Sequence, residues 1–74
     1  MTPADVDILV NNAPVPPGYR LEVEPQRRHK YRSLWSVRVY RDDQKVWGRA
    51  YYNPAAGIVA AQAVAWAMSR EAAA

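Results

Sequence analysis

The sequence contains no cysteine. A chain without cysteine forms no disulfide bond, offers no thiol nucleophile and builds no cysteine-rich zinc site. This composition is typical of proteins in a reducing cytoplasm, and we expect that location. The 74 residues suffice for one small domain. A core of this size gives limited stability unless a partner or a second copy adds buried surface.

Long apolar runs are also missing. No stretch of the sequence approaches the roughly 20 apolar residues that a membrane-spanning helix needs. Asp5 and Asp7 lie near the N-terminus, where a signal peptide carries basic residues. The sequence therefore predicts a soluble, unprocessed protein that makes no contact with a membrane.

Residues suited to catalysis are scarce. His29 is the only histidine, and it lies in a run of cations with no nucleophile or metal ligand nearby in the sequence. Asp42 and Asp43 fall in a predicted turn, where aspartate bonds to the backbone. The three glycines are isolated and do not form a phosphate-binding loop. We therefore expect no enzymatic activity, no cofactor and no metal site.

Three runs of the chain have the periodicity of strands. Residues 19–24, 34–41 and 45–52 alternate between two kinds of side chain, as half-buried strands do. The polar loop Asp42-Asp43-Gln44 is short enough to join the last two runs as a hairpin. Together the three runs predict an antiparallel sheet.

The alternation also predicts which side chains face outward. Trp35, Val37 and Val39 share the apolar side of the second run, and we expect Val46, Gly48, Ala50 and Tyr52 to face the same way. The outward side should then carry Arg20, Glu22, Glu24, Arg38, Tyr40, Lys45, Trp47, Arg49 and Tyr51. On that side, Glu22 and Glu24 are expected to form ordinary ion pairs with Arg20 and Arg38.

A helix is predicted from Pro54 to about residue 71. Asn53 is suited to the N-cap and Pro54 to the first helical position. At 100° per residue, the side expected to cover the sheet carries Gly57, Ala60, Val64, Ala67 and Met68. The other side carries Ile58, Val59 and Trp66, which is more apolar than a solvent-exposed side should be. We expect the N-terminal arm, a second protomer or a partner to cover it.

Residues 1–18 are predicted to form an arm before the domain of residues 19–74. The apolar segment Val6–Val10 is interpreted either as an added edge strand or as a strap over the helix. Residues 13–18 contain three prolines and a glycine, which favours an extended linker that ends in a turn. The expected fold class is α+β, a three-stranded antiparallel sheet packed against one C-terminal helix.

Two groups of residues are candidates for binding a partner. Tryptophan, tyrosine and arginine are enriched at binding hot spots, and the expected outward face offers Arg38, Tyr40, Trp47, Arg49 and Tyr51. The predicted loop between the first two strands adds a dense basic cluster of Arg27, Arg28, Lys30 and Arg32. The alternative is that arginine stems merely cover the aromatic rings and that the loop is simply solvated.

The net charge is +3. This value permits contact with nucleic acid or with an acidic protein surface, but it is modest for a dedicated DNA-binding protein. It also argues against a protein that imitates the phosphate backbone through an acidic surface.

Several short motifs follow one another in residues 35–68: Val37-Arg38-Val39-Tyr40-Arg41-Asp42, then Lys45-Val46 and Gly48-Arg49-Ala50, and then Pro54 opening an alanine-rich helix that ends near Ala67-Met68. In these motifs and their order, the segment resembles a family of small phage-encoded anti-CRISPR proteins of the type I-F group. The sequence differs from the family at Asp43-Gln44, at Trp47, Tyr51 and Trp66, and throughout the N-terminal arm.

The resemblance implies a non-enzymatic, stoichiometric inhibitor in the cytoplasm of the host bacterial cell. Such a protein binds a type I CRISPR surveillance complex and blocks DNA binding or nuclease recruitment. We expect it to dock on a protein subunit, alone or together with the bound nucleic acid. The expected contact region is the outward sheet face with the basic loop.

Two other classes remain open. A small β-sheet DNA-binding protein of a phage or mobile element would lay its sheet in the major groove, with bases contacted by Arg20, Arg38 and Arg49 and phosphates by Arg27, Arg28 and Lys30. Glu22 and Glu24 would then face the DNA and be repelled. The third class is a homodimeric structural or accessory protein that pairs through the helix with Trp66 and Ile58.

Overall fold

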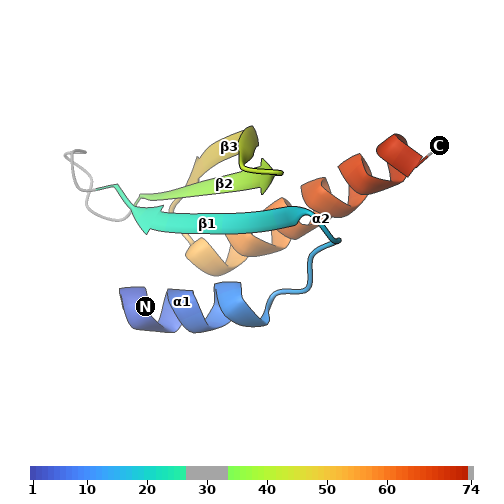
Figure 1. The fold of residues 1–74 in the computed structure, drawn as a ribbon. Coiled ribbons are helices and arrows are strands. Elements are labelled where there is room, and N and C mark those ends of the chain that lie inside the picture. Colours follow the sequence, from blue (N-terminus) through green and yellow to red (C-terminus); the bar gives the residue numbers. More distant parts are fainter. Residues whose placement is uncertain (27–33, 74) are drawn as a thin grey trace.

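The computed structural model describes residues 1–26 and 34–73. The elements in chain order are α1 (Pro3–Asn12), β1 (Tyr19–Pro25), β2 (Trp35–Arg41), β3 (Gln44–Tyr51) and α2 (Pro54–Ala73). The strands form one antiparallel sheet in the order β1-β2-β3. Helix α2 packs on all three strands, and α1 packs on β1 and α2 (Figure 1). The predicted α+β class, with a three-stranded sheet and a C-terminal helix, is confirmed.

The N-terminal segment is a helix, so the alternative of an added edge strand is wrong. Thr2 begins α1 with a capping box: the Asp5 amide donates to Thr2 Oγ1 at 3.2 Å, and the Thr2 amide donates to Asp5 Oδ2 at 3.1 Å. Pro3 takes the first helical position, where its missing amide hydrogen costs nothing. Val6 is fully buried and Val10 packs half-buried against the core, so these two side chains anchor the helix.

The proline-rich linker crosses α2 and is fixed at one carbonyl. The Pro14 oxygen accepts hydrogen bonds from Gln62 Nε2 at 3.0 Å and from Trp66 Nε1 at 3.2 Å. Pro16 is buried, and Gly18 takes a positive φ of 85° in the turn that leads into β1. The predicted extended linker ending in a turn is present, and Trp66 anchors it.

The β2–β3 hairpin contains a bulge that the sequence did not reveal. Asp42 and Asp43 have φ values of 49° and 66°, which make a two-residue turn with the twist that hairpins favour. Tyr40 then pairs with Lys45, but Val39 pairs with Trp47, so Val46 is an extra residue in β3. A residue inserted into one strand turns every following side chain to the other face of the sheet.

The predicted orientation of β3 is therefore wrong. Trp47, Arg49 and Tyr51 lie opposite Val39, Val37 and Trp35, on the helix side, while Gly48 and Ala50 lie on the open side. Trp47 and Tyr51 are half-buried against the core, with ring centroids 6.4 Å apart. Full burial of a large apolar side chain is worth about 1.5–3 kcal/mol, and the half-buried Trp47 and Tyr51 give the core more apolar area than Gly48 and Ala50 would in the other orientation. This difference explains why the bulged register is preferred.

Helix α2 begins as predicted. Asn53 Oδ1 accepts from the amides of Ala55 at 3.0 Å and Ala56 at 3.4 Å, which caps the helix, and Pro54 occupies its first position. Gly57 allows the closest approach to the sheet, because a Cβ there would lie 2.7 Å from Val37 Cγ2 and 3.0 Å from Tyr51 Cδ1.

The buried side of α2 is wider than predicted. It carries Gly57 as expected, but also Ile58, Ala61 and Ala65. The prediction that Ile58 faces away from the core is wrong, since only 5% of it is exposed. The reason is that α1 packs beside α2, so the helix has two neighbours to bury against. The buried apolar core consists of Val6, Leu21, Val23, Val37, Val39, Ile58, Ala61 and Ala65.

Neither helix of the described chain has the length and apolar character needed to cross a bilayer.

Candidate functional site

The side of the sheet that faces away from the helices is the candidate site, and we call it the open sheet face. The strand register places on it Arg20, Glu22, Glu24, Ser36, Arg38, Tyr40, Lys45, Gly48 and Ala50. No element among residues 1–26 and 34–73 packs over this face. It is therefore accessible to a partner.

Charges of opposite sign pair across the open sheet face. Arg38 Nη1 lies 2.8 Å from Glu22 Oε1 and 3.6 Å from Glu24 Oε2. Arg38 and Glu22 are direct cross-strand partners, so the strand pairing brings the two groups together. The hydrogen bond to Glu22 raises the pKa of Arg38 above its ordinary value. These contacts confirm the ion pairs expected from the alternation.

Arg20 links the pairs to the hairpin turn. Its Nη1 lies 3.2 Å from Glu22 Oε2, and its Nη2 lies 3.7 Å from Asp43 Oδ1. Its guanidinium carbon also lies 4.2 Å from the centroid of the Tyr40 ring. Each exposed contact is worth at most about 1 kcal/mol, so the network contributes to the orientation of side chains more than to stability.

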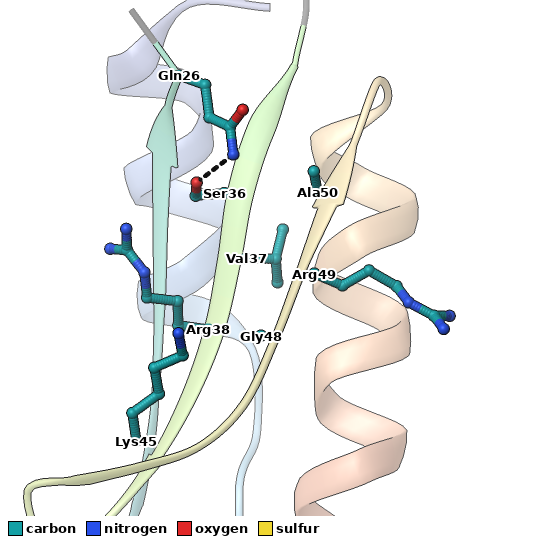
Figure 2. Close-up of a pocket in the computed structure, with 8 residues that line it drawn as sticks. All are labelled: Gln26, Ser36, Val37, Arg38, Lys45, Gly48, Arg49 and Ala50. Carbon is teal, nitrogen blue, oxygen red and sulfur yellow. Dashed lines mark hydrogen bonds between the residues drawn. The ribbon is translucent and has the colours of Figure 1, made fainter. Parts of the chain in front are cut away.

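A polar hollow of about 230 Å³ lies beside this network. Figure 2 shows its lining, in which Arg38 and Lys45 extend on one side of the sheet while Arg49 points the other way, alongside α2. Gly48 leaves room for the Lys45 stem, because a Cβ there would lie 3.0 Å from Lys45 Cε. Gln26 Nε2 donates to Ser36 Oγ at 2.8 Å at the other end of the hollow.

The hollow offers groups that suit a polar or acidic side chain. Lys45 supplies an ammonium group that pairs with no carboxylate among the described residues. The Ser36 oxygen accepts from Gln26, and among residues 1–26 and 34–73 its hydroxyl hydrogen has no acceptor. The site can therefore bind a polar group.

The structure separates the predicted binding residues into three sets. Arg38 and Tyr40 lie on the open sheet face as predicted. Trp47, Arg49 and Tyr51 lie on the helix side, so they do not belong to this surface. The basic cluster of Arg27, Arg28, Lys30 and Arg32 lies outside the described residues. Gln26 and Ser36 were not predicted as binding residues, although Ser36 alternates in phase with Arg38 and could have been placed there.

Among the residues that the structure describes, histidine, aspartate and glutamate do not gather in a group of three that could hold a metal ion. Comparisons with protein-family models, with curated proteins and with solved structures found no match for this chain.

Proposed function

We propose that this protein is a non-enzymatic inhibitor that docks on a type I CRISPR surveillance complex through its open sheet face. It blocks DNA binding or recruitment of the nuclease in the cytoplasm of a phage-infected bacterium. The resemblance of residues 35–68 to type I-F anti-CRISPR proteins supports the class of target. The open sheet face supports the mode of binding.

The observation that best supports docking through this face is that its charges are of both signs and are paired with each other. Arg38 lies between Glu22 and Glu24, and Arg20 is held over Tyr40. Side chains that are ordered before binding lose less conformational freedom in a complex. A surface that presents both signs side by side matches the mixed polar surface of a protein subunit and confers specificity.

The alternative of a β-sheet DNA-binding protein has less support. Glu22 and Glu24 lie on the face that would enter the groove, where phosphates would repel them. Arg20 and Arg38 are already bound to carboxylates. Arg49, the third arginine expected to contact bases, points to the helix side. Any nucleic acid contact is therefore proposed to accompany protein contact rather than replace it.

The proposal is tested by mixing the purified protein with purified type I surveillance complexes and measuring complex formation and target-DNA binding. The expected result is a stable complex that no longer binds or cleaves its target. Tight, strongly salt-dependent binding to bare duplex DNA, with no binding to any surveillance complex, would contradict it and favour the DNA-binding alternative.

Two cations of β3 provide a matched pair of variants. Lys45 lies on the open sheet face and Arg49 on the helix side. Lys45→Glu is expected to weaken target binding at least about tenfold, whereas Arg49→Glu should change it little. The reverse order of effects would move the docking surface to the other side of the sheet.

A further inference from the structure

A second surface lies on the side of the molecule opposite the open sheet face. Here α1 and the first half of α2 run side by side (Figure 1). Between them lies a groove of about 270 Å³ lined by Leu9, Asn12, Ala13, Pro14, Ala55, Ile58, Val59 and Gln62. We call it the helix-side groove. Only Asn12 and Gln62 carry polar side chains, so its lining is almost entirely apolar.

Large apolar side chains at the groove are exposed. Ile8 is 59% exposed, Leu9 38% and Val59 66%. Trp66, which is 42% exposed, lies about two turns after Val59 along α2, where its indole nitrogen donates to the Pro14 oxygen. Scattered exposed apolar residues are normal, but exposed apolar side chains that line a groove favour an interaction site.

We propose that the helix-side groove binds a second copy of this chain and forms a two-fold symmetric dimer. The groove and the side chains that would fill a groove occur on the same surface, since Leu9 of α1 and Val59 of α2 line it and are partly exposed. A two-fold interface requires this kind of self-complementary patch. Each copy places its aliphatic side chains in the groove of the other.

Charge complementarity selects an antiparallel arrangement of the two copies. Helix α1 carries Asp5 and Asp7 and no basic residue, and α2 has Arg70 in its last turn. Both helices begin at the same end of the molecule (Figure 1). When the α2 helices cross antiparallel near Val59, the last turn of one α2 lies near the acidic α1 of the other copy. Asp5 lies one turn before Leu9 on the groove side of α1, so Asp5 and Arg70 then attract each other between the copies.

The small size of the core explains why a second copy would stabilise this chain. The buried apolar side chains are all aliphatic, and six of the eight are valine or alanine, namely Val6, Val23, Val37, Val39, Ala61 and Ala65. A chain of this size rarely gains more than about 3–5 kcal/mol from its own core. Burial of Ile8, Leu9 and Val59 between two copies adds apolar area that one copy leaves in water.

The test measures the mass of the full chain by sedimentation equilibrium from about 1 µM to about 1 mM. The expected result is a concentration-dependent rise from 8.4 kDa to twice that mass. Val59→Asp should raise the dissociation constant at least about a hundredfold, because it places a carboxylate in the apolar contact. Tyr52→Asp is the matched control, since Tyr52 is also 66% exposed but lies outside the groove, and it should leave the dimer unchanged.

A charge reversal tests the arrangement independently of apolar burial. Arg70→Asp should weaken the dimer, because it places a carboxylate near Asp5 of the other copy, whereas Arg70→Lys keeps the attraction and should leave the dimer nearly unchanged. Circular dichroism confirms that each variant is folded. A monomer mass over the whole concentration range would overturn the proposal. A dimer that tolerates Val59→Asp as well as Tyr52→Asp would overturn the groove as its interface.

Discussion

The open sheet face and the helix-side groove differ in the kind of group they present. On the sheet, arginines lie within 2.8–3.7 Å of carboxylates, so the charges are largely satisfied within the molecule. In the groove, aliphatic side chains remain in contact with water. A polar surface whose charges are already paired is stable in water without a partner, so it suits reversible, specific docking. An apolar groove is costly when it is free and suits a lasting contact. The two sides are therefore suited to different partners.

The largest expected effect comes from separating α2 from the sheet, which would abolish both surfaces together. Gly57→Val places methyl groups where even a Cβ would lie 2.7 Å from Val37 Cγ2. We expect a loss of about 3 kcal/mol in the free energy of unfolding, measured by urea denaturation. Ala63→Val, at an exposed position of the same helix, is the control and should cost less than about 1 kcal/mol. Equal losses for both variants would mean that the helix does not pack as closely as described.

The second effect should distinguish the two surfaces. Arg38→Glu gathers three carboxylates on the open sheet face in place of the pairs with Glu22 and Glu24. We expect target binding to weaken at least about tenfold, which corresponds to about 1.4 kcal/mol. The dissociation constant of the dimer should stay the same, because the groove lies on the other side. Calorimetry with the surveillance complex and sedimentation of the free protein measure the two quantities separately. Parallel loss of both would show that the surfaces are coupled.

A smaller effect, this time an increase in stability, is expected at Tyr19, which lies between the sheet and the helices. The Tyr19 hydroxyl is buried and has no hydrogen-bond partner among the described residues. Burial of a polar group without a partner is unfavourable, so Tyr19→Phe should raise the free energy of unfolding by up to about 1 kcal/mol. Thermal unfolding measures the change. A lower melting temperature would reveal that the hydroxyl is hydrogen-bonded in solution.

The smallest effect concerns pH and α1, which forms one wall of the groove. Hydrogen bonds from the Thr2 amide and hydroxyl hold the pKa of Asp5 below its usual value. The folded state therefore favours the carboxylate. Its contribution is complete above the pKa of Asp5 in the unfolded chain and is lost as the pH falls through the lower pKa of the folded chain. Helicity measured below about pH 4 should thus fall less in Thr2→Ala than in the unaltered protein. Equal pH profiles would contradict the role of this cap.

Much of the architecture could be predicted from local patterns. Alternation in β1 and β2 identified the strands and the ion pairs between them, because period-2 placement depends only on the backbone. Asn53 and Pro54 identified the start of α2, because the cap is made within a few residues. The sequence also contains the two residues of the α1 capping box, Thr2 and Asp5. Together they are enough to predict that a helix begins before the apolar segment Val6–Val10, in place of the expected strand or strap.

The side that β3 presents could not be predicted from its alternation. A period-2 pattern with large residues on one side and small ones on the other fits either orientation. The orientation depends on whether Val46 pairs with β2 or forms a bulge. In the structure it forms the bulge and has no partner in β2. Only the competition between burying Trp47 and Tyr51 and burying Gly48 and Ala50 decides it, and that competition depends on how closely α2 approaches. The predicted side of the sheet was therefore correct for the side chains of β2 and wrong for most of those of β3.

The bulge at Val46 has a consequence for how such a protein tolerates a change in chain length. Lys45 pairs with Tyr40 and Trp47 with Val39, so loss of the Val46 codon would leave both pairs in place and make the ladder regular. Trp47, Arg49 and Tyr51 would stay beneath the helix, and Gly48 and Ala50 would stay on the open side. This position of β3 can therefore lose a residue without altering either surface, and descendants of one ancestor can differ in length here while they keep the same contacts.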